Sequence, residues 1–122
     1  MADEITKTLS LSVTNGNLDA AIDLGTAQVD QAAQGLIDNV QTVGTGAHEA
    51  LELGDISTAG VFAFHNLDDA NYVEVGLDVG ATFYPFLKLE AGESASGRAG
   101  TNSLYAKANT ANVKLRCFIL ED

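Results

Sequence analysis

The chain begins with an alternation of apolar and polar residues between positions 5 and 14. The apolar positions are Ile5, Leu9, Leu11 and Val13. Because side chains of a strand point alternately to its two faces, this period of two predicts a strand with one solvated face. Asn15-Gly16 follows, which is a strong signal for a hairpin turn. Residues 18–24 alternate again, so we expect the returning strand there, with Gly25 ending it.

Short runs of β-prone residues recur along the rest of the chain, about ten residues apart. They predict strands at residues 36–43, 60–64, 72–77, 83–89, 104–106 and 112–120. We expect residues 29–35 to form a loop or a short helix, and residues 50–53 to form a short strand or a turn. The small polar residues 91–103 predict an exposed loop, and Pro85 predicts either a sheet edge or the start of a strand.

The last predicted strand carries a clear two-residue pattern. Its inward positions are expected to be Val113, Leu115, Cys117 and Ile119. Lys114 and Arg116 fall on the opposite face, which they share with Phe118 and Leu120. Because that face is apolar at one end, it is a place where another chain can pack.

With 122 residues, 46% of them apolar, the chain has the size and composition of one ordinary globular domain. Eight or so short strands, punctuated by glycines, predict an all-β fold. We expect residues 1–122 to form a single antiparallel β-sandwich domain that is jelly-roll-like. No apolar stretch is long enough for a membrane-spanning helix. Residues 1–4 lack the basic and apolar segments of a secretory signal, so we expect none.

The charge is strongly and unevenly negative. Seventeen acidic residues against six basic ones give a formal charge of −11, and no Lys or Arg occurs from Thr8 to Leu87. Nucleic-acid backbones and anionic membrane surfaces are bound by clustered Lys and Arg, so the sequence argues against both partners. The acidity fits simple solubility or a saline habitat, and it also fits a protein that works close to packaged DNA without binding it.

Few residues of the sequence are candidates for catalysis or metal binding. Cys117, on the inward face of its strand, is expected to be a small buried apolar residue, and one cysteine excludes an internal disulfide. His48 and His65 are far apart in sequence and are expected to be structural rather than metal ligands. Asn66, Asp68, Asp69 and Asn71 could supply oxygen ligands to calcium but lack the EF-hand order, which favours an Asx-rich turn. We therefore predict no enzyme, no metal and no cofactor.

A succession of short motifs resembles a known class of proteins. The motifs are QTVGTG at 41–46, EALELGDI at 49–56, GVFAF at 60–64, NYVEVG at 71–76, PFLKLEAGE at 85–93 and LYAKAN at 104–109. This order resembles small virion proteins of tailed bacteriophages, including capsid decoration (cement) proteins, over about residues 36–120. The resemblance implies a β-rich fold of jelly-roll type and a structural place in the particle, at the capsid surface, in the tail or in an adaptor.

These observations lead to the expectation of a capsid decoration protein that binds the outer surface of the assembled phage head and stabilises the lattice. Its expected partners are the major capsid protein and sister copies in a homotrimer, since capsids offer threefold sites. It would be made in the host cytoplasm and reside on the virion surface. A tail or head–tail adaptor protein, a carbohydrate-binding β-sandwich module and a small metal-dependent enzyme are the alternatives.

Two groups of residues are the candidates for interfaces. The N-terminal segment could add a strand to a neighbour's sheet edge through residues that include Ile5, Leu9, Leu11 and Val13. The aromatic group consists of Phe83, Tyr84 and Phe86. Aromatic side chains anchor many interfaces. Packing within one subunit would also explain either group, and for the aromatic group it is the favoured explanation.

Overall fold

The computed structural model describes residues 3–122; Met1 and Ala2, part of the segment in which we expect no secretory signal, lie outside the described residues. The predicted all-β class is confirmed, because the ten elements of the described chain are all strands. The strands divide into two compact units, one up to Ala32 and one over Ala33–Asp122. Within residues 3–122, no helix is long and apolar enough to cross a membrane.

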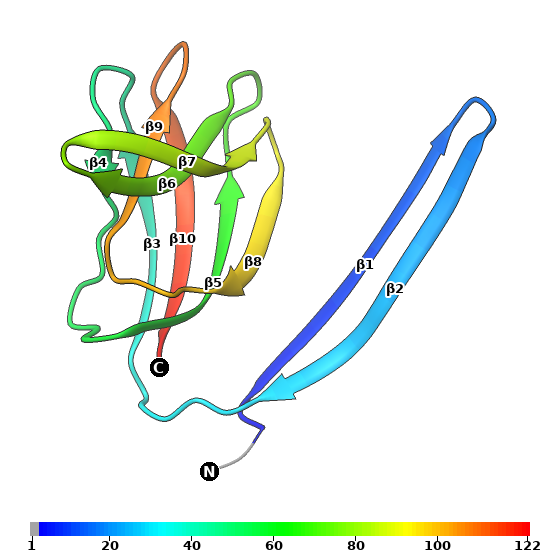
Figure 1. Cartoon of the computed structure of the whole chain (residues 1–122), viewed down its shortest axis with the longest axis horizontal. Coiled ribbons are helices and arrows are strands. Elements are labelled where there is room, and N and C mark those ends of the chain that lie inside the picture. The colour runs from blue at the N-terminus through cyan, green and yellow to red at the C-terminus, as the bar shows by residue number, and fades with distance from the viewer. Residues whose placement is uncertain (1–2) are drawn as a thin grey trace. The chain divides into compact units, whose positions relative to one another are not determined.

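The first unit is a two-stranded antiparallel hairpin of β1 (Ile5–Asn15) and β2 (Leu18–Val29), which run side by side in Figure 1. Gly16 has a φ of +58°, as the first central residue of a type II′ turn requires, so the predicted hairpin is confirmed. The prediction that Gly25 ends the second strand is wrong. Gly25 has a φ of +72° and lies at a β-bulge, so the strand bends there and continues to Val29.

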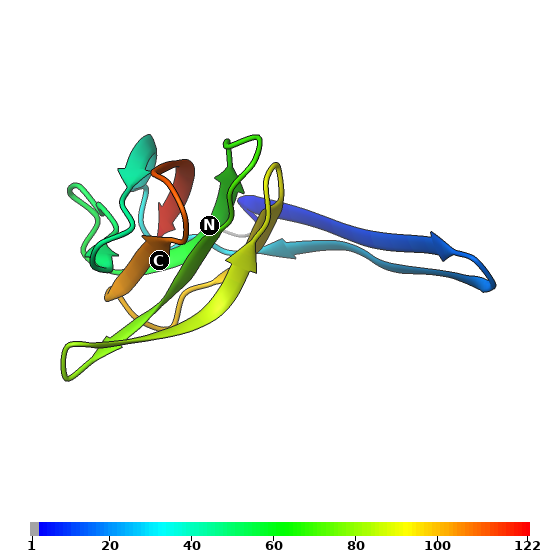
Figure 2. The same cartoon turned by 90° about the horizontal axis from the view of Figure 1, so that it is seen from above.

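The second unit is an eight-stranded sandwich whose two sheets form separate layers in Figures 1 and 2. One sheet has the order β3-β10-β5-β8, and the other has the order β4-β9-β6-β7. The bounds are β3 Leu36–Val43, β4 Glu49–Ala50, β5 Ala59–Asn66, β6 Val73–Val79, β7 Thr82–Leu89, β8 Ser94–Arg98, β9 Leu104–Ala108 and β10 Val113–Glu121. The first and last strands of this unit, β3 and β10, lie side by side. Successive strands alternate between the two sheets except β6 and β7, which form a hairpin in one sheet, and this is the jelly-roll order.

The core of the sandwich lies between the two sheets. The predicted inward side chains of β10 are all fully buried: Val113, Leu115, Cys117 and Ile119. Phe64 of β5 and Val75 of β6 meet them there with no exposed surface. On the outer face of β10, Arg116 is exposed and donates two hydrogen bonds to the carboxylate of Asp38, at 3.1 and 2.9 Å. The alternation of β10 thus divides core from solvent as predicted.

The predicted exposed loop at 91–103 is wrong in its middle, where Ser94–Arg98 forms the edge strand β8 paired with β5. Backbone hydrogen bonds to β5 hold this strand, and Ser96 Oγ adds a bond to the Phe62 carbonyl. Of the two positions predicted from Pro85, the sheet edge is confirmed, since β7 is the last strand of its sheet.

Candidate interaction surfaces

The hairpin has one apolar and one polar face, fixed by its register. Leu11 lies opposite Ile22, and Val13 lies opposite Ala20. We call the side chains of this face the apolar hairpin face: Leu9, Leu11, Val13, Leu18, Ala20 and Ile22. All six are exposed; Leu11 retains 65% of its surface, and even Val13 retains 42%. Leu9, Leu11 and Val13, predicted as interface residues, therefore lie on one accessible apolar surface.

The opposite face of the hairpin is hydrophilic. The serines and threonines of β1 pair there with polar residues of β2, except Ser12, which lies opposite Ala21. The hydroxyls of Thr8 and Thr26 are hydrogen-bonded at 2.9 Å. Asp19 and Asp23 also lie on this face, opposite Thr14 and Ser10. The hairpin is thus amphipathic. Near its turn, the acidic residues Asp19 and Asp23 both lie on the hydrophilic face.

The base of the hairpin differs from its outer part. Ile5, the fourth predicted interface residue of the N-terminal segment, is half-buried and lies opposite Val29. Lys7 is half-buried as well and lies opposite Ala27 on the same face. The purely aliphatic surface therefore begins at Leu9 and extends toward the turn.

The predicted aromatic group on β7 is divided by the structure. Phe83 is half-buried, and its ring stacks on His48 with the centroids 5.2 Å apart. Tyr84 and Phe86 keep 55% and 54% of their surface exposed, and we call these two residues the β7 aromatic pair. Phe86 is the additional residue of a β-bulge, because Gly76 lies opposite Pro85 while Val75 lies opposite Leu87.

His48, in the loop between β3 and β4, contacts the β6–β7 hairpin. Its Nε2 lies 2.6 Å from Oδ2 of Asp78, and its ring also meets Tyr105 edge-on, with 5.4 Å between centroids. The hydrogen bond with His48 is the main reason that the pKa of Asp78 lies below its ordinary value. Asp78 Oδ1 also accepts the backbone N–H of Ala81, which has a φ of +67°. No local signal in the sequence pairs His48 with a residue thirty positions away.

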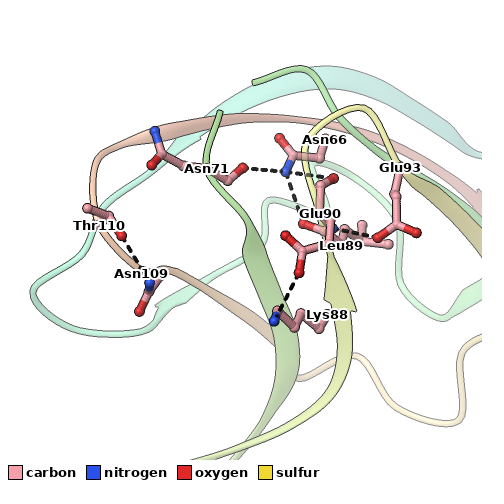
Figure 3. Close-up of polar contacts among 8 residues, drawn as sticks. All are labelled: Asn66, Asn71, Lys88, Leu89, Glu90, Glu93, Asn109 and Thr110. Carbon is pink, nitrogen blue, oxygen red and sulfur yellow. Dashed lines mark hydrogen bonds and ion pairs between the residues drawn. The ribbon is translucent and has the colours of Figure 1, made fainter. Parts of the chain in front are cut away.

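Asn66 and Asn71, two of the residues considered as calcium ligands, lie in a hydrogen-bonded turn (Figure 3). The fully buried Asn66 places its Nδ2 at 2.9, 3.0 and 3.2 Å from the carbonyl oxygens of Asn71, Leu89 and Glu90. Its Oδ1 accepts the backbone N–H of Asp68. The carboxylate of Asp68 accepts the N–H groups of Asn71 and Ala70, which lower its pKa. This is the Asx-rich turn that the composition favours.

Cys117 and His65 lie apart from these surfaces. Cys117 is fully buried, as predicted, and burial raises the pKa of its thiol to about 12. His65 is exposed on β5, opposite Arg116 of β10, whereas His48 lies over the other sheet. Among residues 3–122, no group of three or more His, Cys, Asp or Glu side chains is arranged to hold a metal ion.

No known protein family, no curated protein and no solved structure matches this chain.

Proposed function

We propose that this protein is a decoration protein of a tailed-bacteriophage head, which binds the outer surface of the assembled capsid and stabilises its lattice. The observation that carries the proposal is the amount of apolar strand surface exposed by an otherwise well-packed jelly-roll protein. Both the apolar hairpin face and the β7 aromatic pair present large side chains to solvent. Apolar surfaces of this kind mark sites of protein–protein contact. The sequence resemblance to small virion proteins supplies the class of partner.

The charge supports an external position on the head. With a net charge of −11 and a long segment free of Lys and Arg, the protein is repelled by packaged DNA rather than bound to it. A protein on the outside of the head needs no affinity for nucleic acid. The shortage of basic residues is therefore compatible with the outer surface and unfavourable for a protein lining the inside.

Stabilisation follows from mass action. A protein that binds the assembled lattice but not the free capsid subunit lowers the free energy of the lattice with every copy bound. A homotrimer at a threefold site would bind three equivalent capsid subunits at once, so each contact can be weak while the whole trimer stays attached.

We assign the capsid contact to the β7 aromatic pair. Tyr84 and Phe86 lie on an edge strand, and both rings are more than half exposed. Tyrosine and phenylalanine bury a large area at a low cost in side-chain entropy, which makes them good anchors in an interface. The neighbouring Phe83 is not included because its ring already packs against His48.

The test is cosedimentation of the full chain with expanded capsids built from the major capsid protein of the same phage. We expect saturable binding at hundreds of copies per head for the wild type and loss of binding for the double variant Tyr84→Ser, Phe86→Ser. A matched control replaces an exposed aliphatic residue outside these surfaces, Leu67→Ser in the turn after β5, and should bind like the wild type. Failure of the wild type to bind would overturn the proposal, and about a dozen copies per particle would identify a tail or adaptor protein instead.

A further inference from the structure

The apolar hairpin face is a surface that a two-stranded sheet cannot cover by itself. β1 and β2 form a single layer of two strands, and large aliphatic residues such as Leu11 and Ile22 keep half or more of their surface exposed. An isolated two-stranded hairpin is marginally stable in water at best and needs packing on its apolar face. A stable hairpin therefore requires a covering surface.

The chemistry of the face indicates what can cover it. From Leu9 to the turn and back to Ile22, its side chains are aliphatic except at the very end, where Asn15 lies opposite Leu18. The acidic residues of this outer part, Asp19 and Asp23, lie on the other face. Two such faces can thus meet without carrying a charge into the contact, which would be costly. The surface is complementary to itself.

The size of the face also fits a copy of itself. Six aliphatic residues with these exposures present roughly 500 Å² of surface, so two fully covered faces together bury roughly 1,000 Å², about the least that a specific interface needs. Three faces around a threefold axis would bury more. A second hairpin is therefore large enough to form a stable contact.

We propose that the apolar hairpin faces of sister copies pack against one another and hold this protein together as a homo-oligomer. The occupant of the face is a second copy of this chain. This inference does not depend on the capsid role: it concerns self-association, and it places the capsid and sister-copy contacts on different residues.

The mode of contact differs from strand addition, which the N-terminal segment also permits. Strand addition would pair the backbone edge of β1 or β2 with another sheet and leave both hairpin faces in solvent. Face-to-face packing instead buries Leu11 and Ile22 and leaves Ser12 and Ala21 exposed to solvent. Variants on the two faces therefore distinguish the two modes.

The first experiment measures the mass of the full chain by sedimentation equilibrium over a wide concentration range. In the double variant Leu11→Lys, Ile22→Glu, opposite charges replace a directly paired aliphatic couple, so the hairpin keeps a favourable cross-strand pair. The control, Ser12→Lys with Ala21→Glu, introduces the same charges one position along, on the polar face. Both variants keep the net charge of the wild type.

We expect an oligomeric wild type and control. The apolar-face variant should associate more than about 100-fold more weakly, because charges would be carried into the contact. A monomeric wild type would overturn the inference, and so would equal association of the two variants. A further result would reassign the face. If the wild type is a monomer that binds capsids, and the apolar-face variant does not bind them, the face belongs to the capsid contact.

A second experiment does not depend on the charged variant folding. Ala20 and Ala21 are adjacent, exposed alanines on opposite faces of β2. In the variant Ala20→Cys, a short bismaleimide should link sister chains in dilute solution, whereas Ala21→Cys should stay uncrosslinked. The native Cys117 is fully buried and does not compete. Equal crosslinking of the two variants would contradict face-to-face packing.

Failure of this inference and failure of the capsid proposal give different results. An oligomer that depends on Leu11 and Ile22 but does not bind capsids would preserve the inference and remove the capsid role. A monomer that binds capsids through Tyr84 and Phe86 would remove the inference of self-association and preserve the capsid role.

Discussion

Asn66 shows how a single polar side chain organises one end of the sandwich. Among the described residues, it is the polar one that is fully buried, and its amide contacts three carbonyl oxygens from two segments of the chain. A buried amide is tolerated only when its donors and acceptor are used, and here both ends are. The residue therefore fastens the turn after β5 to the end of β7.

Replacing Asn66 should be costly. In Asn66→Ala, the carbonyl groups of Asn71, Leu89 and Glu90 lose a buried donor, and a small cavity remains, so we expect a loss of about 2–4 kcal/mol in the free energy of unfolding. Asn109→Ala is the control, because Asn109 is exposed and bonds only its neighbour Thr110 among the contacts drawn in Figure 3. Urea titration would measure both; similar midpoints for the two variants would contradict the role of Asn66.

Asp68 gives the same turn a dependence on pH. Hydrogen bonds from the N–H groups of Asn71 and Ala70 hold the pKa of its carboxyl below the ordinary value of 3.8. Because the folded-state pKa is the lower one, the stabilisation is fully present above the unfolded pKa and is lost as pH falls through the folded pKa. Its loss is therefore confined to acid solution.

The variant Asp68→Asn isolates this effect, since an amide resembles the protonated carboxyl. We expect the wild type to be more stable than the variant above about pH 5 and the two to converge as the pH falls well below 4. Urea unfolding at a series of pH values measures the difference. A difference that stays constant across that series would show that the charge of Asp68 contributes nothing.

At the scale of the elements, β-bulges set which residues reach the solvent. The bulge between Val75 and Gly76 adds Phe86 to β7, and the one between Leu9 and Ser10 bends the hairpin at Gly25. Each bulge depends on a glycine, but for different reasons. Gly25 adopts a left-handed backbone conformation, whereas Gly76 is needed because the backbone of β7 comes very close.

Gly76→Ala should therefore disturb the edge of the sandwich. A Cβ at this position would clash with the carbonyl oxygen of Tyr84 and lie 2.5 Å from Cα of Pro85, so backbone must move. We expect a loss of about 2–3 kcal/mol in the free energy of unfolding. Gly46→Ala, where nothing lies within 4 Å of the added Cβ, should change it by less than about 0.5 kcal/mol. Equal thermal midpoints for the two variants would contradict this account.

Prediction from the sequence succeeded where a strand carries its own pattern. Apolar residues occupy every second position from Val113 to Ile119, because one face of β10 lies in the core, and the interior of the sandwich could be placed from them. The strand β8 escaped prediction because its small polar residues carry no such pattern, and its backbone bonds come from β5, about thirty residues away. The partner of Phe83 could not be predicted for the same reason, since the ring that stacks on it belongs to His48.

The candidate surface could be predicted only in part. The alternation of β1 indicates an apolar face with Leu9, Leu11 and Val13, but alternation alone predicts a face packed against the core. Nothing in the pattern tells whether the covering layer belongs to the same chain. The structure gives the hairpin only two strands, and the exposure of Leu11 follows from that topology rather than from any residue type.

For the whole molecule, charge and apolar surface act in opposite directions. Each copy carries a net charge of −11, so sister copies repel one another through solvent. The apolar hairpin face attracts without involving charge, and the jelly-roll unit keeps its own core sealed by Val113, Phe64 and their neighbours. In the proposed oligomer, self-association would be the balance of a local hydrophobic attraction and a long-range repulsion, and low concentrations of salt would act mainly on the repulsion.

This balance predicts that salt strengthens self-association. The screening length falls from about 30 Å at 0.01 M to about 8 Å at 0.15 M ionic strength, so repulsion between acidic copies weakens over that range. We expect the dissociation constant of the oligomer, measured by sedimentation equilibrium in sodium chloride, to fall by at least about threefold. The charge-conserving control Ser12→Lys, Ala21→Glu should show the same slope. Weakening by salt would mean that opposite charges hold the copies together, and the aliphatic contact between hairpins would then be the wrong explanation.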